Sequence, residues 1–287
     1  MLVSVLGFGG AEIGFESAPQ ADVDSLLNAA LDSGLNVIDT GECYADSEEK
    51  IGKAVANRRD DFYLFTKCGH SSGIDLPDWD PKLLAQSIDR SLKRLQTDCV
   101  DLMQLHSCSA DLLRMGDVID VVLRAKEAGK TQYVGYSGDH DDALYAVECG
   151  AFDSLQTSLN IADQEGLSLT LPKAVHRGMG VIAKRPIANA AWKTGGEPPT
   201  NGYHKTYWER LQKLQYDFLI DDDAVGKALR FTLSQPGVNV AIVGTKNPSR
   251  WAVNSAYAQL GPLSEPVLQA IRNRWKEVAP ADWRGQN

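Results

Sequence analysis

Four polar residues could together deliver a proton to a carbonyl oxygen. Asp39, Tyr44, Lys67 and His106 each end, or closely follow, a short apolar run. A tyrosine hydroxyl is a poor acid near neutral pH, but a neighbouring ammonium lowers its pKa and an aspartate can hold that ammonium in place. The sequence therefore predicts Tyr44 as the general acid and Lys67 as its activator. Asp39 would orient Lys67, and His106 would donate a hydrogen bond to the oxygen as negative charge develops there.

This set of residues contains no nucleophile and no metal cluster, so the chemistry requires an external source of hydride. Each residue alone has an ordinary structural explanation, such as a solvated lysine at the rim of a sheet. Their occurrence at consecutive strand ends favours a shared function. A metal-dependent hydrolase would need several histidines or carboxylates at strand ends, and only His106 and Asp39 clearly qualify. We therefore predict no metal site.

The elements that would position these residues are short apolar runs at a fairly even spacing. Most are four to six residues long and rich in Val, Ile, Phe or Tyr, which is typical of buried strands. Eight such runs occur, at residues 3–8, 36–39, 62–66, 100–105, 133–136, 154–159, 181–184 and 240–243.

Amphipathic helical patterns separate these runs. Apolar residues recur at helical spacing over residues 23–31, 84–95, 115–122 and 224–233. Eight strands alternating with helices predict a parallel α/β fold, and the count fits a single (β/α)₈ TIM barrel over residues 1–287. Long loops are expected after strands three and seven, at 70–80 and 188–215. The second is rich in Gly and Pro and is expected to be an irregular lid.

The composition limits the class of partner. The 287 residues include 29 Lys and Arg against 38 Asp and Glu, for a net charge of −9. This balance argues against nucleic acid as a partner, because such proteins rely on basic surfaces. No apolar stretch approaches the roughly 18 residues that span a membrane, and no signal peptide is evident. The five scattered cysteines favour a reduced, cytoplasmic protein. The oligomeric state is left open.

Several motifs resemble those of the aldo-keto reductase superfamily over roughly residues 3–260. Asp-Thr-Gly-Glu-Cys-Tyr at 39–44 is similar to the family's Asp-Thr-x-x-x-Tyr signature, and Ser-Glu-Glu-Lys-Ile-Gly follows at 47–52. Further matching segments lie in family order at 91–106, 134–137, 155–156, 180–186 and 241–244. The resemblance implies a (β/α)₈ barrel and NADPH-dependent reduction of a carbonyl. It also implies a catalytic tetrad of Asp39, Tyr44, Lys67 and His106.

The segment after the eighth strand is suited to a phosphate. In barrels the loops after strands seven and eight are a frequent phosphate site, and free N–H groups at a helix N-terminus attract anions. Arg250 can form paired hydrogen bonds to a phosphate, and Lys246 can add a point charge. The resemblance implies that Gly244, Lys246 and Arg250 hold the adenosine 2′-phosphate and that Asn254 contacts adenine. We therefore expect NADPH to be preferred over NADH.

The nicotinamide end departs from the family pattern. Gly138 stands where the family usually has an asparagine that contacts the carboxamide, although Ser137 and Gln156 can still supply polar groups. Lys184 or Arg185 replaces the aromatic residue that often stacks on the nicotinamide ring. A guanidinium can stack on a planar ring, so Arg185 is a candidate substitute.

The leading hypothesis is reduction of a small aldehyde or ketone to an alcohol, with the proton supplied by Tyr44. The alternative is an NADP(H)-binding regulatory or partner-binding subunit with little turnover, motivated by Gly138 and Lys184. Tight cofactor binding without turnover would distinguish the second from the first.

Overall fold

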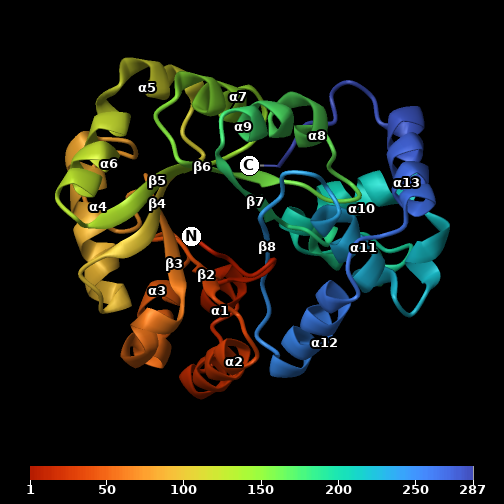
Figure 1. Ribbon diagram of the computed structural model, residues 1–287, viewed down its shortest axis with the longest axis horizontal. Coiled ribbons are helices and arrows are strands. Elements are labelled where there is room, and N and C mark those ends of the chain that lie inside the picture. The colour runs from red at the N-terminus through yellow and green to blue at the C-terminus, as the bar shows by residue number, and fades with distance from the viewer. Residues whose placement is uncertain (287) are drawn as a thin grey trace.

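The chain folds into one closed barrel of parallel strands. The structure, a computed structural model, describes residues 1–286. Within them eight strands pair in sequence order, and β1 closes the barrel against β8 (Figure 1). The strands are β1 Leu6–Gly9, β2 Val37–Asp39, β3 Tyr63–Cys68, β4 Val100–His106, β5 Thr131–Ser137, β6 Ser154–Ser158, β7 Gly180–Lys184 and β8 Val240–Val243. The predicted single-domain (β/α)₈ fold is confirmed.

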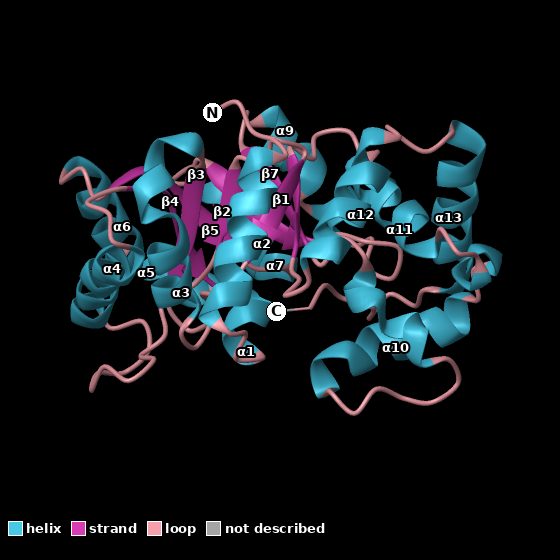
Figure 2. Cartoon of the chain, turned by 90° about the horizontal axis from the view of Figure 1, so that it is seen from below, coloured by secondary structure: helices cyan, strands magenta, loops and turns pink. Residues whose placement is uncertain are grey.

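Helices surround the barrel and cover the outer face of its strands (Figures 1 and 2). The principal helices are α2 Gln20–Asp32, α3 Ser47–Val55, α4 Pro81–Leu95, α6 Asp117–Glu127, α7 His140–Cys149, α11 Ala224–Leu233, α12 Pro248–Gln259 and α13 Glu265–Val278. Shorter helices are α1 Ala11–Phe15, α5 Ala110–Met115, α8 Gly166–Leu169 and α9 Leu171–His176, with 3₁₀ segments at Ala56–Asp61, Ala188–Thr194 and Asp217–Ile220. The helix α10 Gly202–Leu214 and the last described residues lie at the end of the molecule opposite the N-terminus (Figure 2).

The barrel interior is filled from alternate positions of the strands. Val37, Phe65, Leu102, Ile182 and Ile242 form one buried layer inside the barrel. Side chains alternate between the two faces of a strand, so residues two or four positions further on also point inward. Every predicted site residue that lies within a strand occupies one of these inward-pointing positions. They are Asp39, Lys67, His106, Ser137, Gln156 and Lys184. The strands therefore direct all of them toward the mouth formed by their carboxyl ends.

Two predicted segments differ from the structure. The apolar stripe at 115–122 does not form one helix, because Gly116 adopts a φ of +89° and separates α5 from α6, leaving Met115 exposed. The 188–215 segment is not irregular throughout, since it contains α10. The Asn201 side chain caps that helix by accepting a hydrogen bond from the Tyr203 N–H at 2.9 Å. The buried residues Tyr207, Leu211 and Leu214 supply its apolar face.

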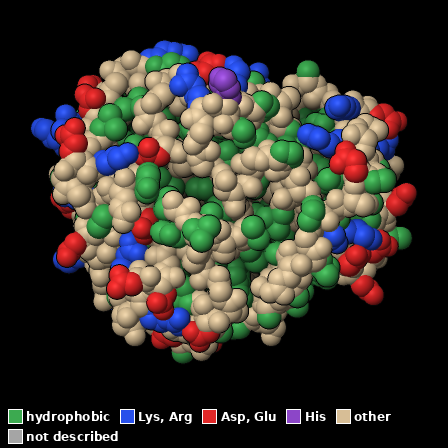
Figure 3. Space-filling model, in the orientation of Figure 1, with side chains coloured by type: hydrophobic (Ala, Val, Ile, Leu, Met, Phe, Trp, Pro, Cys, Tyr) green, Lys and Arg blue, Asp and Glu red, His purple; other side chains and the backbone are tan. Residues whose placement is uncertain are grey.

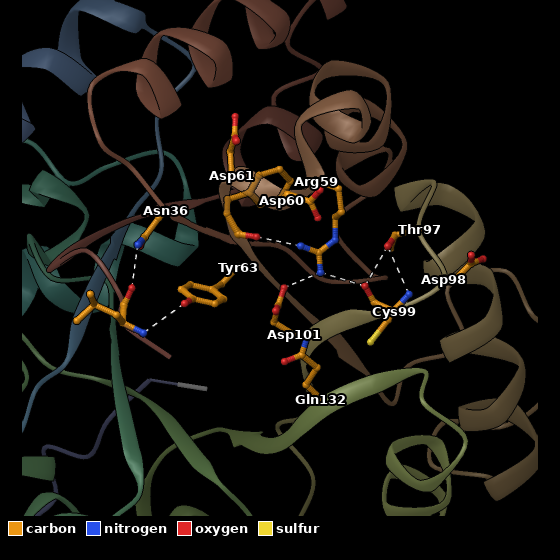
Figure 4. Close-up of a pocket in the computed structure, with 12 residues that line it drawn as sticks. Asn36, Arg59, Asp60, Asp61, Tyr63, Thr97, Asp98, Cys99, Asp101 and Gln132 are labelled. Atoms are coloured by element: carbon orange, nitrogen blue, oxygen red, sulfur yellow. Dashed lines mark hydrogen bonds and ion pairs between the residues drawn. The ribbon is translucent and has the colours of Figure 1, made fainter.

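One groove in the described part of the chain lies away from the predicted site. It has a volume of about 700 Å³ and is lined at the amino ends of β3 and β4 (Figure 4). Its central cation is already paired: Arg59 donates to Asp101 at 2.6 Å and to the carbonyl of Phe62 at 2.9 Å. In barrels, polar groups at this end serve stability rather than catalysis. We therefore interpret this groove as structural.

Among residues 1–286 no helix is long and apolar enough to cross a bilayer. On the face shown in Figure 3, charged side chains lie mainly toward the edge and hydrophobic side chains toward the middle.

Candidate active site

A buried ion pair lies at the carboxyl ends of β2 and β3. Lys67 Nζ donates to Asp39 Oδ2 at 2.5 Å and to the carbonyl oxygen of Thr40 at 2.6 Å. Both charged side chains are at most 2% exposed. Burying an ammonium is costly unless a carboxylate and further acceptors compensate it, and here both are present. The strands thus fix one positive charge just below the mouth of the barrel.

Tyr44 stands above this charge in the turn that follows β2. Lys67 Nζ lies 4.9 Å from the centroid of the tyrosine ring, and the His106 ring lies edge-on at 5.7 Å. The short helix α1 closes over the turn: a Cβ on Gly14 would come within 2.0 Å of the Tyr44 carbonyl oxygen. The Phe15 ring packs 5.5 Å from the Tyr44 ring. The structure therefore brings all four predicted residues together in one place, while their catalytic roles stay predictions.

Burial and the local charges set the protonation of these groups. Burial raises the pKa of Tyr44 to about 12, although Lys67 acts in the predicted direction and lowers it. Burial is the largest single influence on the pKa of Lys67 and lowers it, but Asp39 and the neighbouring Tyr44 and Cys43 together raise the pKa overall. Burial, and then the charges of Lys67 and Lys184, hold the pKa of His106 well below its usual value. At neutral pH the site therefore presents a protonated phenol, an ammonium and a neutral imidazole.

Gln104 is a site residue that the sequence-based prediction missed. Its Nε2 donates to Asp39 Oδ1 at 3.2 Å, so it holds the carboxylate oxygen that Lys67 does not use. It lies two positions before His106 on β4 and is fully buried. The alternation of side chains along the strand could have identified Gln104. It places this polar residue on the same inward face as His106, and a buried polar side chain requires a hydrogen-bond partner.

Two polar side chains at the ends of β5 and β6 lack hydrogen-bond partners among the described residues. Ser137 Oγ and both Oε1 and Nε2 of Gln156 are buried and unpaired. The two residues are opposite each other in the β5–β6 register. Buried polar atoms are nearly always hydrogen-bonded, so an amide-bearing ligand fits here: it can both donate and accept. Ser137 and Gln156 thus have polar atoms free for an amide group, and their contact with a nicotinamide stays a prediction.

The loop after β8 leads into α12 as predicted. Asn247 caps the helix by accepting a hydrogen bond from the Ser249 N–H at 2.9 Å, and Pro248 occupies its first turn. Arg250 is exposed and Asn254 is buried on this helix. Lys246 pairs with Glu16 at 2.7 Å on the surface, so a phosphate there would compete with a carboxylate for this cation. Arg250 is thus the cation more readily available to a phosphate.

Comparison with known proteins agrees with this geometry. The sequence model of the Aldo/keto reductase family matches residues 5–276. The chain belongs to this family. The resemblance predicted from the motifs at 39–44 and beyond is confirmed.

Individual relatives of the family cover nearly the whole chain. An uncharacterized oxidoreductase of Bacillus subtilis is 26% identical, with 96% of this chain and 94% of the relative aligned. L-galactose dehydrogenase of Arabidopsis thaliana is 28% identical over 94% of this chain and 92% of its own. The holo form of an aldo-keto reductase from Bacillus halodurans is 25% identical and superposes with a TM-score of 0.82. The superposition covers 98% of this chain and 95% of the other. An aldo-keto reductase from Klebsiella pneumoniae solved with NADPH shares the fold at 22% identity, with a TM-score of 0.74. The superposition covers 98% of this chain and 93% of the other.

The space around Gly138 is too small for a side chain. A Cβ at this position would lie 2.5 Å from Tyr136 Oη. Tyr136 is fully buried, and its hydroxyl donates to the carbonyl of Cys108 at 2.7 Å, so the ring cannot move aside. The asparagine usual in aldo-keto reductases therefore does not fit beside Tyr136.

The two cations at the end of β7 have partners within the fold. Lys184 forms a buried ion pair with Asp139 at 2.9 Å. Arg185 packs its guanidinium 4.7 Å from the Tyr203 ring and donates to Ser158 Oγ at 3.0 Å and to the Gln286 carbonyl. The aromatic partner of Arg185 in this structure is thus Tyr203. Stacking of Arg185 on a nicotinamide stays a prediction and would require these contacts to change.

Glu42 lies beside the site, and the effect of burial on the pKa of its carboxyl can be tested through stability. Burial raises the pKa of its carboxyl from about 4.5 to about 8, and Oε2 has no partner among residues 1–286. Below pH 4.5 folded and unfolded chains both carry the proton. Between pH 4.5 and 8 only the folded chain keeps it, so the contribution of Glu42 to wild-type stability falls by about 1 kcal/mol per pH unit.

Glu42→Gln removes this titration and is expected to become progressively more stable than wild type from pH 5 to pH 8. Urea midpoints measured across this range check the expectation. Glu127→Gln, on the exposed face of α6, is the control and should show no such trend. A Glu42→Gln advantage that did not change with pH would contradict the raised pKa.

Proposed function

We propose that this protein reduces a small aldehyde or ketone to an alcohol with NADPH as the hydride donor. The observation that carries the proposal is the grouping of Tyr44, Lys67, Asp39 and His106 at one mouth of the barrel. The unpaired polar atoms of Ser137 and Gln156 support a bound nicotinamide beside them. The net charge of −9 supports a small molecule, and not nucleic acid or a membrane, as the partner.

The residues of the chain would divide the work as follows. Bound NADPH supplies the hydride. His106, held neutral, donates a hydrogen bond to the substrate oxygen and fixes its position. Tyr44 passes its hydroxyl proton to the same oxygen as negative charge develops there. Lys67 stabilises the tyrosinate that remains, because its ammonium lies 4.9 Å from the ring, and Asp39 with Gln104 keeps Lys67 in place.

Two measurements test the proposed function. Protein fluorescence titrated with NADPH and then NADH shows whether a dinucleotide binds and which one is preferred. Absorbance at the NADPH band with 4-nitrobenzaldehyde as substrate shows turnover. Tight NADPH binding with no oxidation across a broad panel of aldehydes and ketones would instead support a cofactor-binding regulatory subunit.

Replacing Arg250 with alanine should weaken NADPH binding selectively. A charge-assisted hydrogen bond to a phosphate contributes about 1.5–3 kcal/mol, so the Kd for NADPH should rise about 10- to 100-fold. NADH lacks the 2′-phosphate and should bind within about threefold of wild type. Arg124→Ala, on the exposed side of α6, controls for loss of surface charge. Equal weakening of both dinucleotides would rule out the assignment of Arg250 to the 2′-phosphate.

A further inference from the structure

Three potential metal ligands meet at the rim of the barrel mouth. Cys43 follows β2, His70 follows β3 and His106 ends β4. One ligand atom from each lies within 4.8 Å of the other two, and all three residues are partly exposed. Cys43 Sγ is already 3.4 Å from His106 Nδ1. The sequence predicts no metal site, because only His106 and Asp39 were counted as potential ligands at strand ends.

His70 is held in the manner of a metal-binding histidine. Its Nδ1 lies 2.9 Å from Asp78 Oδ2, and the other oxygen of Asp78 accepts the Ser71 N–H at 2.7 Å. A carboxylate on one ring nitrogen fixes the tautomer and leaves the other nitrogen, here Nε2, as a lone-pair donor. This second observation is independent of the spacing between the three ligands.

The backbone of the loop supports the same placement. Gly69 has a φ of +141°, and a Cβ there would come within 2.3 Å of the Trp79 ring. The Trp79 N–H donates to the Gly69 carbonyl at 2.9 Å, which closes the loop on itself. The rings of His70 and Trp79 pack at 5.4 Å, and those of His70 and His106 at 5.3 Å. The loop therefore holds His70 against the mouth rather than in solvent.

We propose that Cys43, His70 and His106 form a site for Zn²⁺. One thiolate and two imidazoles suit zinc, whereas Mg²⁺ and Ca²⁺ prefer oxygen ligands. With Zn–S near 2.3 Å and Zn–N near 2.0 Å, ligand atoms of a tetrahedron lie roughly 3.3–3.6 Å apart. The Cys43–His106 separation of 3.4 Å already matches this value, and all three ligand atoms lie within 4.8 Å of one another, so His70 completes the set with a small shift. Binding forms the S–Zn bond and releases the Cys43 thiol proton to solvent.

The bound ion would act as a reversible inhibitor. It would engage a ring nitrogen of His106 and stand at the entrance to the position of the substrate carbonyl. This consequence rests on the proposed reductase function. Zinc should therefore compete with the carbonyl substrate, raising the apparent KM while leaving kcat unchanged, and a chelator should restore the original KM.

Metal binding can be tested without turnover. The full-length protein, freed of metal, is titrated with Zn²⁺ by calorimetry and with Co²⁺ as a spectroscopic probe. One equivalent should bind, and Co²⁺ should give a sulfur-to-metal charge-transfer band. Cys43→Ser should abolish the band and His70→Ala should weaken Zn²⁺ binding at least tenfold. Asp78→Asn, which leaves all three ligands in place, should keep the band and weaken binding about 10- to 100-fold.

Cys149→Ser is the matched control, because Cys149 is an exposed free thiol at the end of α7. It should bind zinc as wild type does. Absence of binding, or binding that survives both Cys43→Ser and His70→Ala, would overturn the proposal. If the protein reduces no carbonyl, the proposed function fails while the titrations still decide the metal site. Full turnover with the ion bound would show that the ion does not occupy the mouth.

Discussion

Replacing Tyr44 with phenylalanine is expected to lower kcat for carbonyl reduction by about 10²- to 10⁴-fold, the usual contribution of a positioned general acid. The substitution removes one oxygen and keeps the ring, so the contacts with Phe15 and His106 remain. NADPH should bind the variant within about twofold of wild type, because the residues expected to contact the cofactor lie at the ends of β5 to β8 and not beside Tyr44. Initial rates with 4-nitrobenzaldehyde and a fluorescence titration check the two parts.

Tyr145→Phe is the control for loss of a tyrosine hydroxyl. Tyr145 lies on α7, where its ring contacts Arg114 at 4.7 Å, away from the barrel mouth. Its variant should retain the wild-type rate. A Tyr44→Phe variant as active as wild type would show that another group supplies the proton.

Replacing Lys67 with methionine should abolish most activity and also destabilise the fold. The substitution leaves Asp39 buried without its cation, and breaking a buried ion pair in this way costs about 3–5 kcal/mol. Activity should fall because no ammonium remains to stabilise the Tyr44 anion. Urea unfolding and initial rates measure the two effects separately.

The double variant Asp39→Asn, Lys67→Met separates charge from packing. Removing both charges together leaves no buried unpaired ion, so the urea midpoint should recover most of its loss. Activity should not recover. Lys126→Met, which breaks the half-exposed pair with Asp153 at 2.8 Å, should cost less than about 1 kcal/mol. Recovery of activity in the double variant would contradict the role assigned to Lys67.

Much of the fold was predictable because parallel strands buried on both faces leave short, nearly continuous apolar runs. The run ending at Asp39 and the run ending at Leu105 fixed where the strands end, and the mouth followed from the direction of the strands. The segment 188–215 was harder. Its Gly and Pro residues at 195–202 led to the prediction of an irregular loop. The helix α10 was missed, although Tyr207, Leu211 and Leu214 lie at helical spacing and are buried in the structure.

The sequence could predict the site residues whose chemistry depends on their own side chain. It could not predict properties that depend on which other residues surround them. Tyr44 and Lys67 could be placed from the strand ends. The net pKa of Tyr44 could not, because it depends on how far burial outweighs the nearby ammonium, and that balance exists only in three dimensions. The role of Gln104 likewise depends on the position of Asp39 across the barrel.

The contact between Gly138 and Tyr136 constrains the order in which this chain could change its sequence. A single substitution that placed asparagine at position 138 would collide with the Tyr136 ring, which is held by the Cys108 carbonyl. A smaller residue would first have to replace Tyr136, leaving a cavity that is itself unfavourable. Each of the two steps is costly alone and tolerable only with the other. Position 138 is thereby closed to asparagine by any single change and opens to it only through two coupled changes.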